Sequence, residues 1–411
     1  MIKKTIEIIL ISIFSVGLVS CADVEQADPY DGWLHDLEVV LDYPQGHSSN
    51  LRAGVEVKVE NSATLAVYKG ETDAQGKASL KVPSGVYRVS VSDILPSAIF
   101  NGSSDKIVVS EEGFALRLAL NYSKPGSLVI KEIYCGGCKK LPENGDYQSD
   151  KYIIIHNNNM FVEYLDSLCF GSISPYNSQA VNPWITKDPE TGTVKYPDFA
   201  PIAQAIWQFR GTGKDYPVQP GEDVVICLNG AIDHTKQYPL SVNLNKPEYF
   251  VTYNSKFFYN SAYHPVPGNN IPLDHYLEVV IKLDKSNAYT MSISSPAVVL
   301  FKAKGTTMVD FVKDESQVQP IPGSNQNVIT LPWEWILDGV EVFTGKSLTN
   351  TKRLTSSIDA GYVTLSDTFM GKTLHRHVDE AATAERGYEV LMDTNNSSKD
   401  FYERPKQSLH E

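Results

Sequence analysis

Two cysteines separated by two glycines, Cys135 and Cys138, form the arrangement that most directly suggests chemistry. A redox-active CxxC pair needs the N-terminus of a helix, where the helix dipole lowers the pKa of one thiol. Residues 139–145, KKLPENG, predict a loop instead, which argues against redox catalysis. The two thiolates could also be half of a tetrahedral zinc site, completed by His375 and His377. A structural disulfide is the interpretation we favour, because such bonds persist in exported proteins.

Two further cysteines, Cys169 and Cys227, lie in apolar segments. Together with Cys135 and Cys138 they allow three sets of disulfide pairs. Cys169 and Cys227 could pair with each other, or stay as buried thiols that behave like small apolar side chains. The sequence has no second CxxC motif, so we predict no bound metal and no cofactor.

The sequence lacks the common hydrolase motifs. It contains neither HExxH nor GxSxG. Ser103-Ser104-Asp105-Lys106 matches SxxK in its letters, but its surroundings predict a polar turn without the partner motifs of that chemistry. We therefore predict that the protein is not an enzyme.

Aromatic residues gather between positions 184 and 265. They could form a ligand face that stacks on a sugar or packs on a partner protein, or they could fill the core of an elaborated fold. The candidates for ligand binding are Trp184, Trp207, Tyr253, Phe257, Tyr259 and Tyr263.

Charge and length limit the function classes. The chain has 411 residues and a formal net charge of −13, with 36 basic and 49 acidic residues. Neutralising phosphates requires a concentrated basic patch, which we do not find, so we predict no nucleic-acid partner. The length suffices for two or three domains.

The first 21 residues predict an export signal. Lys3 and Lys4 precede a short apolar stretch, residues 8–19, that is too short to span a membrane. Leu18-Val19-Ser20-Cys21 then resembles a bacterial lipobox, which implies that Cys21 carries the lipid of an anchored protein. Residues 22–33 form a tether, and its acidic start, residues 22–28, resembles the surface-export signal of Bacteroidota lipoproteins. We expect a lipid-anchored protein of the outer membrane, displayed on the cell surface.

Residues 34–122 show short apolar runs with a period of two, which predict a small β-sandwich. Three motifs, GVxVxV at 54–59, TDxxG at 72–76 and LxVPxGxYxV at 80–89, resemble the carboxypeptidase-regulatory-like and Cna-B-like domains. Modules of those families generally act as spacers or platforms, and the resemblance implies that role here.

Residues 126–411 resemble a lamin-tail-like domain, an immunoglobulin-like sandwich. The matching segments are 129–133, 152–157, 164–168 and 220–226. Such domains are generally accessory or binding modules in secreted bacterial proteins.

We place an insertion in this second part of the chain at about residues 174–275. Residues 198–209 predict a short helix with Ile202, Ile206 and Phe209 on one face, and 378–386 predict a second helix that ends before Gly387.

The closing segment, residues 393–401, together with the order of the two modules, resembles an uncharacterised family of Bacteroidota lipoproteins. We therefore expect a mainly β protein: a small sandwich followed by a larger lamin-tail-like sandwich with insertions. The function we expect is that of a non-enzymatic accessory or ligand-binding protein, with an outer-membrane barrel such as a TonB-dependent transporter as its partner. The alternatives are an adhesin or structural surface protein, and an envelope hydrolase with an unrecognised site.

Overall fold

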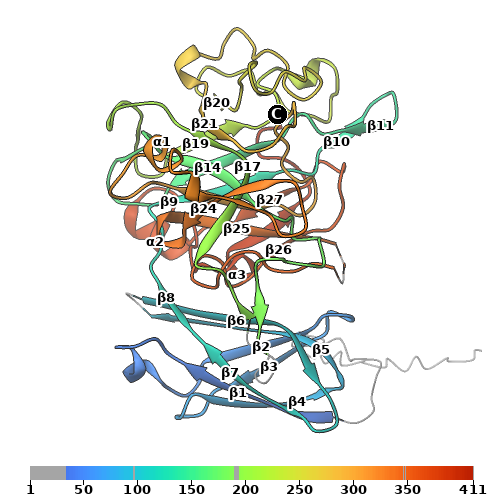
Figure 1. The fold of residues 1–411 in the computed structure, drawn as a ribbon, viewed down its shortest axis with the longest axis vertical. Helices are drawn as coiled ribbons and strands as arrows, with labels where there is room; N and C mark the ends of the chain where they lie inside the picture. Colours follow the sequence, from blue (N-terminus) through green and yellow to red (C-terminus); the bar gives the residue numbers. More distant parts are fainter. Residues whose placement is uncertain (1–33, 96–97, 189–193, 346, 348, 411) are drawn as a thin grey trace, which may run out of the picture.

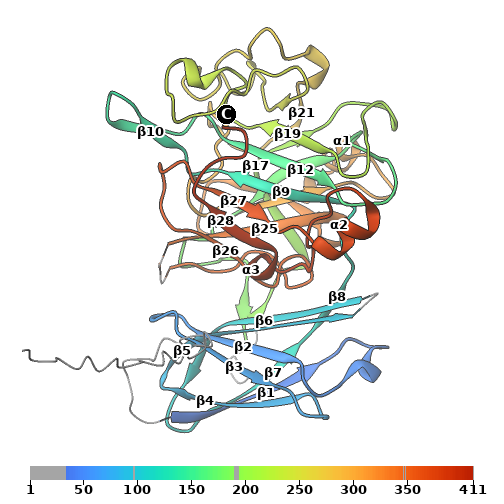
Figure 2. The same ribbon diagram turned by 180° about the vertical axis from the view of Figure 1, so that it is seen from behind.

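The computed structural model describes residues 34–95, 98–188, 194–345, 347 and 349–410. The predicted signal peptide, the lipid-attachment residue Cys21 and the tether, all within residues 1–33, lie outside the described residues. The described chain is built mainly of β-strands in stacked sheets, which confirms the predicted mainly β, sandwich-like fold. A smaller half and a larger half lie end to end (Figures 1 and 2).

The smaller half packs a three-stranded sheet against a five-stranded sheet. The first has the order β4-β1-β7 and consists of β1 (Leu34–Asp42), β4 (Lys77–Pro83) and β7 (Phe114–Ala119). The second has the order β3-β2-β5-β6-β8 and consists of β2 (Glu56–Asn61), β3 (Val67–Glu71), β5 (Gly85–Leu95), β6 (Ala98–Val109) and β8 (Asn121–Ser123). Alternate residues point inward and form a core of their own, because one face of each strand is apolar.

The larger half is built on two further sheets. A six-stranded sheet, β20-β19-β12-β9-β27-β28, contains β9 (Leu128–Tyr134), β12 (Tyr152–Asn157), β19 (Asp223–Cys227), β20 (Phe250–Val251), β27 (Thr373–Arg376) and β28 (Phe401–Arg404). An eight-stranded sheet, β23-β24-β17-β14-β22-β25-β26 with β21 beside β17, contains β14 (Cys169–Ile173), β17 (Phe199–Gln208), β21 (Glu278–Lys282), β22 (Ala297–Phe301), β23 (Val318–Pro320), β24 (Asn327–Pro332), β25 (Ile336–Thr344) and β26 (Val363–Leu365). Three two-stranded sheets pair β10 (Cys138–Lys140) with β11 (Gly145–Tyr147), β13 (Glu163–Tyr164) with β18 (Pro217–Val218), and β15 (Thr186–Lys187) with β16 (Val194–Lys195).

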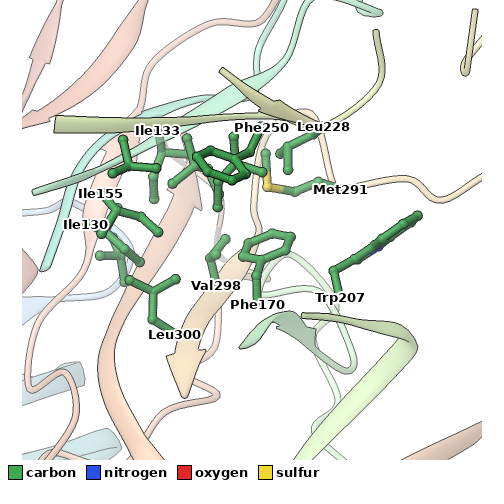
Figure 3. Packing of buried hydrophobic residues seen from close by; sticks show 14 of the residues in the cluster. Ile130, Ile133, Ile155, Phe170, Trp207, Leu228, Phe250, Met291, Val298 and Leu300 are labelled. Carbon is green, nitrogen blue, oxygen red and sulfur yellow. The ribbon is translucent and has the colours of Figure 1, made fainter. Parts of the chain in front are cut away.

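The central core of the larger half lies between these two sheets. Ile130 and Ile155 of the six-stranded sheet meet Phe170, Val298 and Leu300 of the eight-stranded sheet (Figure 3). Separate clusters cover the outer face of each sheet. The inner strands are therefore buried on both faces, and apolar burial supplies the main stabilisation of this half.

The segment predicted as a helix at 198–209 is instead β17, in the interior of the eight-stranded sheet. Ile202 and Ile206 pack on one face of that sheet, while Trp207 and Phe209 pack in the central core. A strand with two apolar faces imitates helical spacing, which explains the wrong prediction. The region predicted as an insertion, 174–275, thus supplies both β17 and β19 to the sheets.

The second predicted helix is confirmed as α2 (Glu380–Arg386). The Asp379 carboxylate accepts a hydrogen bond from the Ala382 amide at 3.0 Å, and Gly387 ends the helix at φ 77°. The other α-helices are α1 (Met308–Phe311) and α3 (Ser397–Asp400). In the described part of the chain, every helix falls short of the length and apolarity that crossing a membrane would require.

A buried arginine, Arg376 on β27, gathers three acidic residues in the larger half. Its guanidinium lies 2.7 Å from Asp338, 3.1 Å from Asp393 and 3.5 Å from Asp400. Asp400 also accepts hydrogen bonds from the Thr394 amide and hydroxyl. These contacts hold the closing segment, residues 393–400, against the sheet.

The closing segment also contacts the smaller half. The buried Asn101 side chain of β6 donates to the backbone carbonyls of Thr394 at 2.8 Å and Asn395 at 3.1 Å. The Asn396 side chain donates to the Ser92 hydroxyl at 2.6 Å. The two halves are thus joined by directional polar contacts, which fix their relative position.

We expect the Asp400 carboxyl to make folding dependent on pH. Burial raises the pKa of Asp400 from 3.8 to about 7, with Arg376 acting in the opposite direction and Asp393 adding to the rise. Between pH 4 and 7 the folded protein therefore keeps a proton that the unfolded chain has lost, so this group lowers the free energy of unfolding as pH rises. Asp400→Asn should remove this pH-dependent decrease. Between pH 4 and 7, the free energy of unfolding of the variant, relative to that of the original chain, should therefore rise by up to about 1.4 kcal/mol per pH unit.

Urea unfolding at pH 4.5, 5.5, 6.5 and 7.5 measures this difference. Asp367→Asn, at a side chain that is 71% exposed, is the matched control and should show no such trend. A pH-independent difference for Asp400→Asn would contradict the assignment.

Candidate functional site

A cleft of about 1060 Å³, here called the central cleft, lies between the two halves. One wall is the outward face of the five-stranded sheet, and the other is formed by the end of β25, by β26 and by the chain near residue 350. In Figures 1 and 2, β6 faces β26 across this junction. The volume of the central cleft is large enough for a small organic ligand. The lining includes Glu60, Leu65, Val86, Arg88, Asp105, Lys106 and Val108 from the smaller half, and Lys187, Phe343, Asn350, Thr351, Tyr362 and Thr364 from the larger half.

Arg88 of β5 occupies the floor of the central cleft. Its Nε donates to Asp105 at 2.5 Å, and its Nη1 lies 3.5 Å from Glu60. The guanidinium carbon is 4.7 Å from the ring centre of Tyr362 and 4.9 Å from that of Phe343. The two rings stack with centres 4.1 Å apart, and the Tyr362 hydroxyl donates to Glu60. One guanidinium therefore links two acids of one half to two rings of the other.

A β-bulge in β6 sets the directions of Asp105 and Lys106. The register between β5 and β6 shifts here, so that both residues lie opposite Arg88. Lys106 has φ 58°, in the left-handed region that residues other than glycine seldom adopt. Bulges and strained residues of this kind often re-aim side chains at functional sites. This bulge brings Asp105 to the guanidinium and leaves Lys106 exposed at the cleft.

The wall contributed by the smaller half is apolar and open to solvent. Leu65 is 37% exposed, Val86 is 40% exposed and Val108 is 59% exposed. Val86 and Val108 are cross-strand partners on β5 and β6, so they form one continuous patch.

The ionisable groups of the floor are paired with one another. Burial acts to raise the pKa of Asp105, but Arg88 and Lys352 outweigh it, and the net pKa is lowered. Burial raises the pKa of the Tyr362 hydroxyl above its ordinary value, and Glu60 adds to the rise. At neutral pH the floor thus holds a carboxylate, a guanidinium and a neutral phenol.

The two cysteines of the CGGC motif are free thiols, and the favoured disulfide is not formed. Cys135 packs in the central core, whereas Cys138 begins β10 with its sulfur 3.5 Å from Asp150 Oδ2. Gly137 makes the turn between them at φ 73°, where a Cβ atom would lie 2.0 Å from the Tyr147 carbonyl oxygen. The pKa of each thiol is raised to about 12 by burial, partly offset by Lys151 for Cys135 and reinforced by Asp150 for Cys138, so neither is a thiolate at neutral pH.

Cys169 and Cys227 are also free and buried. They lie in the two clusters that cover opposite outer faces of the larger half. This arrangement agrees with the buried-thiol alternative.

The six aromatic candidates do not meet on one surface. Trp207 is fully buried in the central core, and Phe257 packs against that core (Figure 3 shows Trp207). Tyr253 packs against the cluster outside the six-stranded sheet. For Trp207 the core interpretation therefore holds.

The remaining aromatic candidates lie outside the buried apolar clusters. Trp184 donates from its indole nitrogen to the Ser174 carbonyl at 3.1 Å. Tyr259 is 68% exposed, and Tyr263 is half-buried. A ligand role for these residues stays a prediction.

Within the described residues, His156, Asp223 and Glu389 are the one group of three that could hold a metal ion. The Lys131 amine already lies 2.6 Å from Asp223 and 2.5 Å from Glu389. His156 shares a hydrogen bond of 2.7 Å with Asp223. A lysine thus fills the position of the cation, and the group forms a closed ion-pair network.

The zinc alternative requires His375 and His377 to gather with the two cysteines of the CGGC motif. His375 lies with its Nε2 3.9 Å from Glu132 and its Nδ1 2.6 Å from the Arg376 carbonyl oxygen. Among the described residues, no potential metal-binding group combines His375 or His377 with Cys135 and Cys138.

The residues of the central cleft do not stand out in the sequence. The sequence predicts a polar turn at Asp105 and Lys106, which match the SxxK letters, but both residues lie in β6. Arg88 and Tyr362 are 274 residues apart in the sequence and belong to no common motif. No local signal marks them, because charged residues on the outward side of alternating strands are what any solvated sheet face shows.

The chain is similar to known proteins in sequence and in fold. Residues 219–408 match the family model DUF4876, described as a protein of unknown function. Among solved structures, the chain resembles a DUF4876 family protein from Bacteroides thetaiotaomicron, with 25% sequence identity, a TM-score of 0.55, and coverage of 90% of this chain and 94% of that one. The resemblance to a Bacteroidota family of unknown function is therefore supported, while the anchor and the module families stay predictions.

A second solved structure, described as that of a proposed adhesin from Bacteroides ovatus, shares 13% identity at a TM-score of 0.22. It covers 70% of this chain and 84% of that one. A likeness of that size carries no argument about function. The search of curated proteins returned no match.

We expect Arg88 to be required for the stability of the central cleft. Arg88→Met leaves the Glu60 and Asp105 carboxylates without their shared cation in a nearly buried site, which should cost about 3 kcal/mol. Adding Asp105→Asn should restore part of the loss. Arg117→Met, at an arginine that is 72% exposed, is the control and should change the free energy of unfolding by less than about 0.5 kcal/mol. Urea unfolding measures all three, and equal effects of Arg88→Met and Arg117→Met would contradict this role.

We also expect all four described cysteines to titrate as thiols. A chain with Cys21→Ser, unfolded in guanidinium chloride without reductant, should give four thiols with Ellman's reagent. The folded chain should give none within minutes, because every one of these side chains is buried. A count of two in the unfolded chain would instead support a disulfide.

Proposed function

We propose that the protein is a non-enzymatic binding protein that takes a ligand in the central cleft. The observation that carries the proposal is the combination of a solvent-open apolar wall with a charged floor whose groups are already paired. Exposed apolar patches beside a few fixed polar groups are typical of ligand sites. The internal pairing of Glu60, Arg88 and Asp105 suits the positioning of a ligand better than proton transfer.

The proposal includes attachment to the outer membrane through a lipid on Cys21 and display on the cell surface. The lipobox and the acidic segment after it support this part. A partner in the same membrane, such as a TonB-dependent transporter or another barrel, fits a tethered accessory protein.

A neutral apolar fluorophore, N-phenyl-1-naphthylamine, tests the cleft directly. The chain with Cys21→Ser should bind one molecule with an increase in fluorescence. Val108→Trp, which fills the apolar patch, should reduce the affinity at least tenfold, because the wall is then occupied.

Val266→Trp is the matched control, because Val266 is 71% exposed and lies outside the cleft lining. It should bind the probe as the parent chain does. Binding that is absent in the parent chain, or that both variants reduce equally, would overturn the proposal.

A further inference from the structure

Two lysines that line the central cleft have no carboxylate within ion-pair distance among the described residues. The Lys106 amine donates to the Ala180 carbonyl oxygen at 3.3 Å, and the Lys187 amine donates to the Lys106 carbonyl oxygen at 2.6 Å. The acids of the lining, Glu60 and Asp105, are paired with Arg88. In a chain of net charge −13, two cations left without an acid favour an anionic ligand at this position.

The two lysines come from different halves and are neighbours in the cleft lining, because the Lys187 amine lies 2.6 Å from the Lys106 carbonyl oxygen. Lys106 belongs to the bulge in β6, and Lys187 belongs to the hairpin of β15 and β16. Burial lowers the pKa of Lys187, and the neighbouring charge of Lys106 lowers it further, while Asp105 acts in the opposite direction. An anion between the two amines would relieve this repulsion.

The apolar patch begins directly beside these lysines. Val108 lies two residues after Lys106 in β6, and both side chains are exposed at the cleft. Val86 and Leu65 extend the patch away from the charged end. An occupant that satisfies both features has an anionic group at one end and an apolar body at the other.

The patch is aliphatic, which separates the candidate ligands. Sugars are usually held against open aromatic faces. Here the rings of Phe343 and Tyr362 stack on each other, and Arg88 covers both. Leu65, Val86 and Val108 suit a hydrocarbon chain instead.

We propose that the ligand of the central cleft is an amphipathic anion, with a hydrocarbon chain on Leu65, Val86 and Val108 and an anionic headgroup between Lys106 and Lys187. This inference rests on the proposed function and names the ligand class of the same site. The headgroup can be a carboxylate or a phosphate, since both accept hydrogen bonds from two amines.

Isothermal titration of the chain with Cys21→Ser, in buffer without detergent, tests the inference with four probes below their micelle-forming concentrations. Dodecanoate and dodecyl phosphate supply a chain with two different anionic headgroups. Dodecanol supplies the chain without charge, and acetate supplies the charge without the chain. Dodecanoate or dodecyl phosphate should bind at one equivalent and at least tenfold more tightly than dodecanol, while acetate should not bind measurably. The tighter of the two anions identifies the headgroup.

The double variant Lys106→Gln/Lys187→Gln should reduce the affinity for the anionic probes about tenfold and leave that for dodecanol unchanged. Val108→Trp should reduce the affinity for all the dodecyl probes. Lys81→Gln, at a lysine that is 63% exposed on the other sheet of the smaller half, is the control for loss of a lysine charge away from the cleft and should leave every affinity unchanged.

The outcomes separate the two proposals. If dodecanol binds as tightly as the anions and only Val108→Trp weakens binding, the cleft is a ligand site but the anionic class is wrong. If the double lysine variant and Lys81→Gln weaken anion binding equally, the headgroup position is wrong. If no dodecyl probe binds, and the neutral fluorophore also fails to bind, the proposed function itself is overturned.

Discussion

The guanidinium of Arg376 contacts three buried acidic side chains and thereby fixes the segment that joins the two halves. Asp393 and Asp400, which begin and end that segment, both contact this one cation. Because the segment is held on the larger half, its carbonyls at 394 and 395 stand at fixed positions for Asn101. The position of the five-stranded sheet, and with it the width of the central cleft, depends on this chain of contacts.

The contacts that join the two halves are mainly polar, and this affects how they contribute to stability and to geometry. Taking charges such as those of Arg88 and Asp105 out of water costs free energy that their attraction only partly returns. The apolar cores within each half already supply the stability of the fold. The junction therefore contributes geometry more than stability: hydrogen bonds and ion pairs fix angle and distance, which a smooth apolar contact would leave adjustable.

The parts of the fold that sequence predicts well are those with one wet face. In the smaller half, alternation of apolar and polar residues is visible because each sheet has a solvent side. β17 could not be predicted in this way, because apolar clusters bury both of its faces. Its apolar residues therefore show no periodicity that would distinguish a strand from a helix. α2 was recognisable because its signals are local: the cap at Asp379 and the glycine at 387 lie within the helix or beside it.

The cleft could not be predicted because its chemistry is assembled from distant segments. A β-bulge in β6 turns Asp105 toward Arg88, and no local sequence pattern predicts this bulge. The aromatic residues looked like a ligand face, but a sheet buried on both sides needs large apolar side chains, and Trp207 serves that need. Val86 and Val108 show the reverse situation. They are exposed on a sheet whose neighbouring positions are covered by the larger half, at a cost of about 25 cal/mol for each Å² of apolar surface left in water. The two valines are cross-strand partners and line the central cleft beside its charged floor, which is why we assign this patch to a ligand.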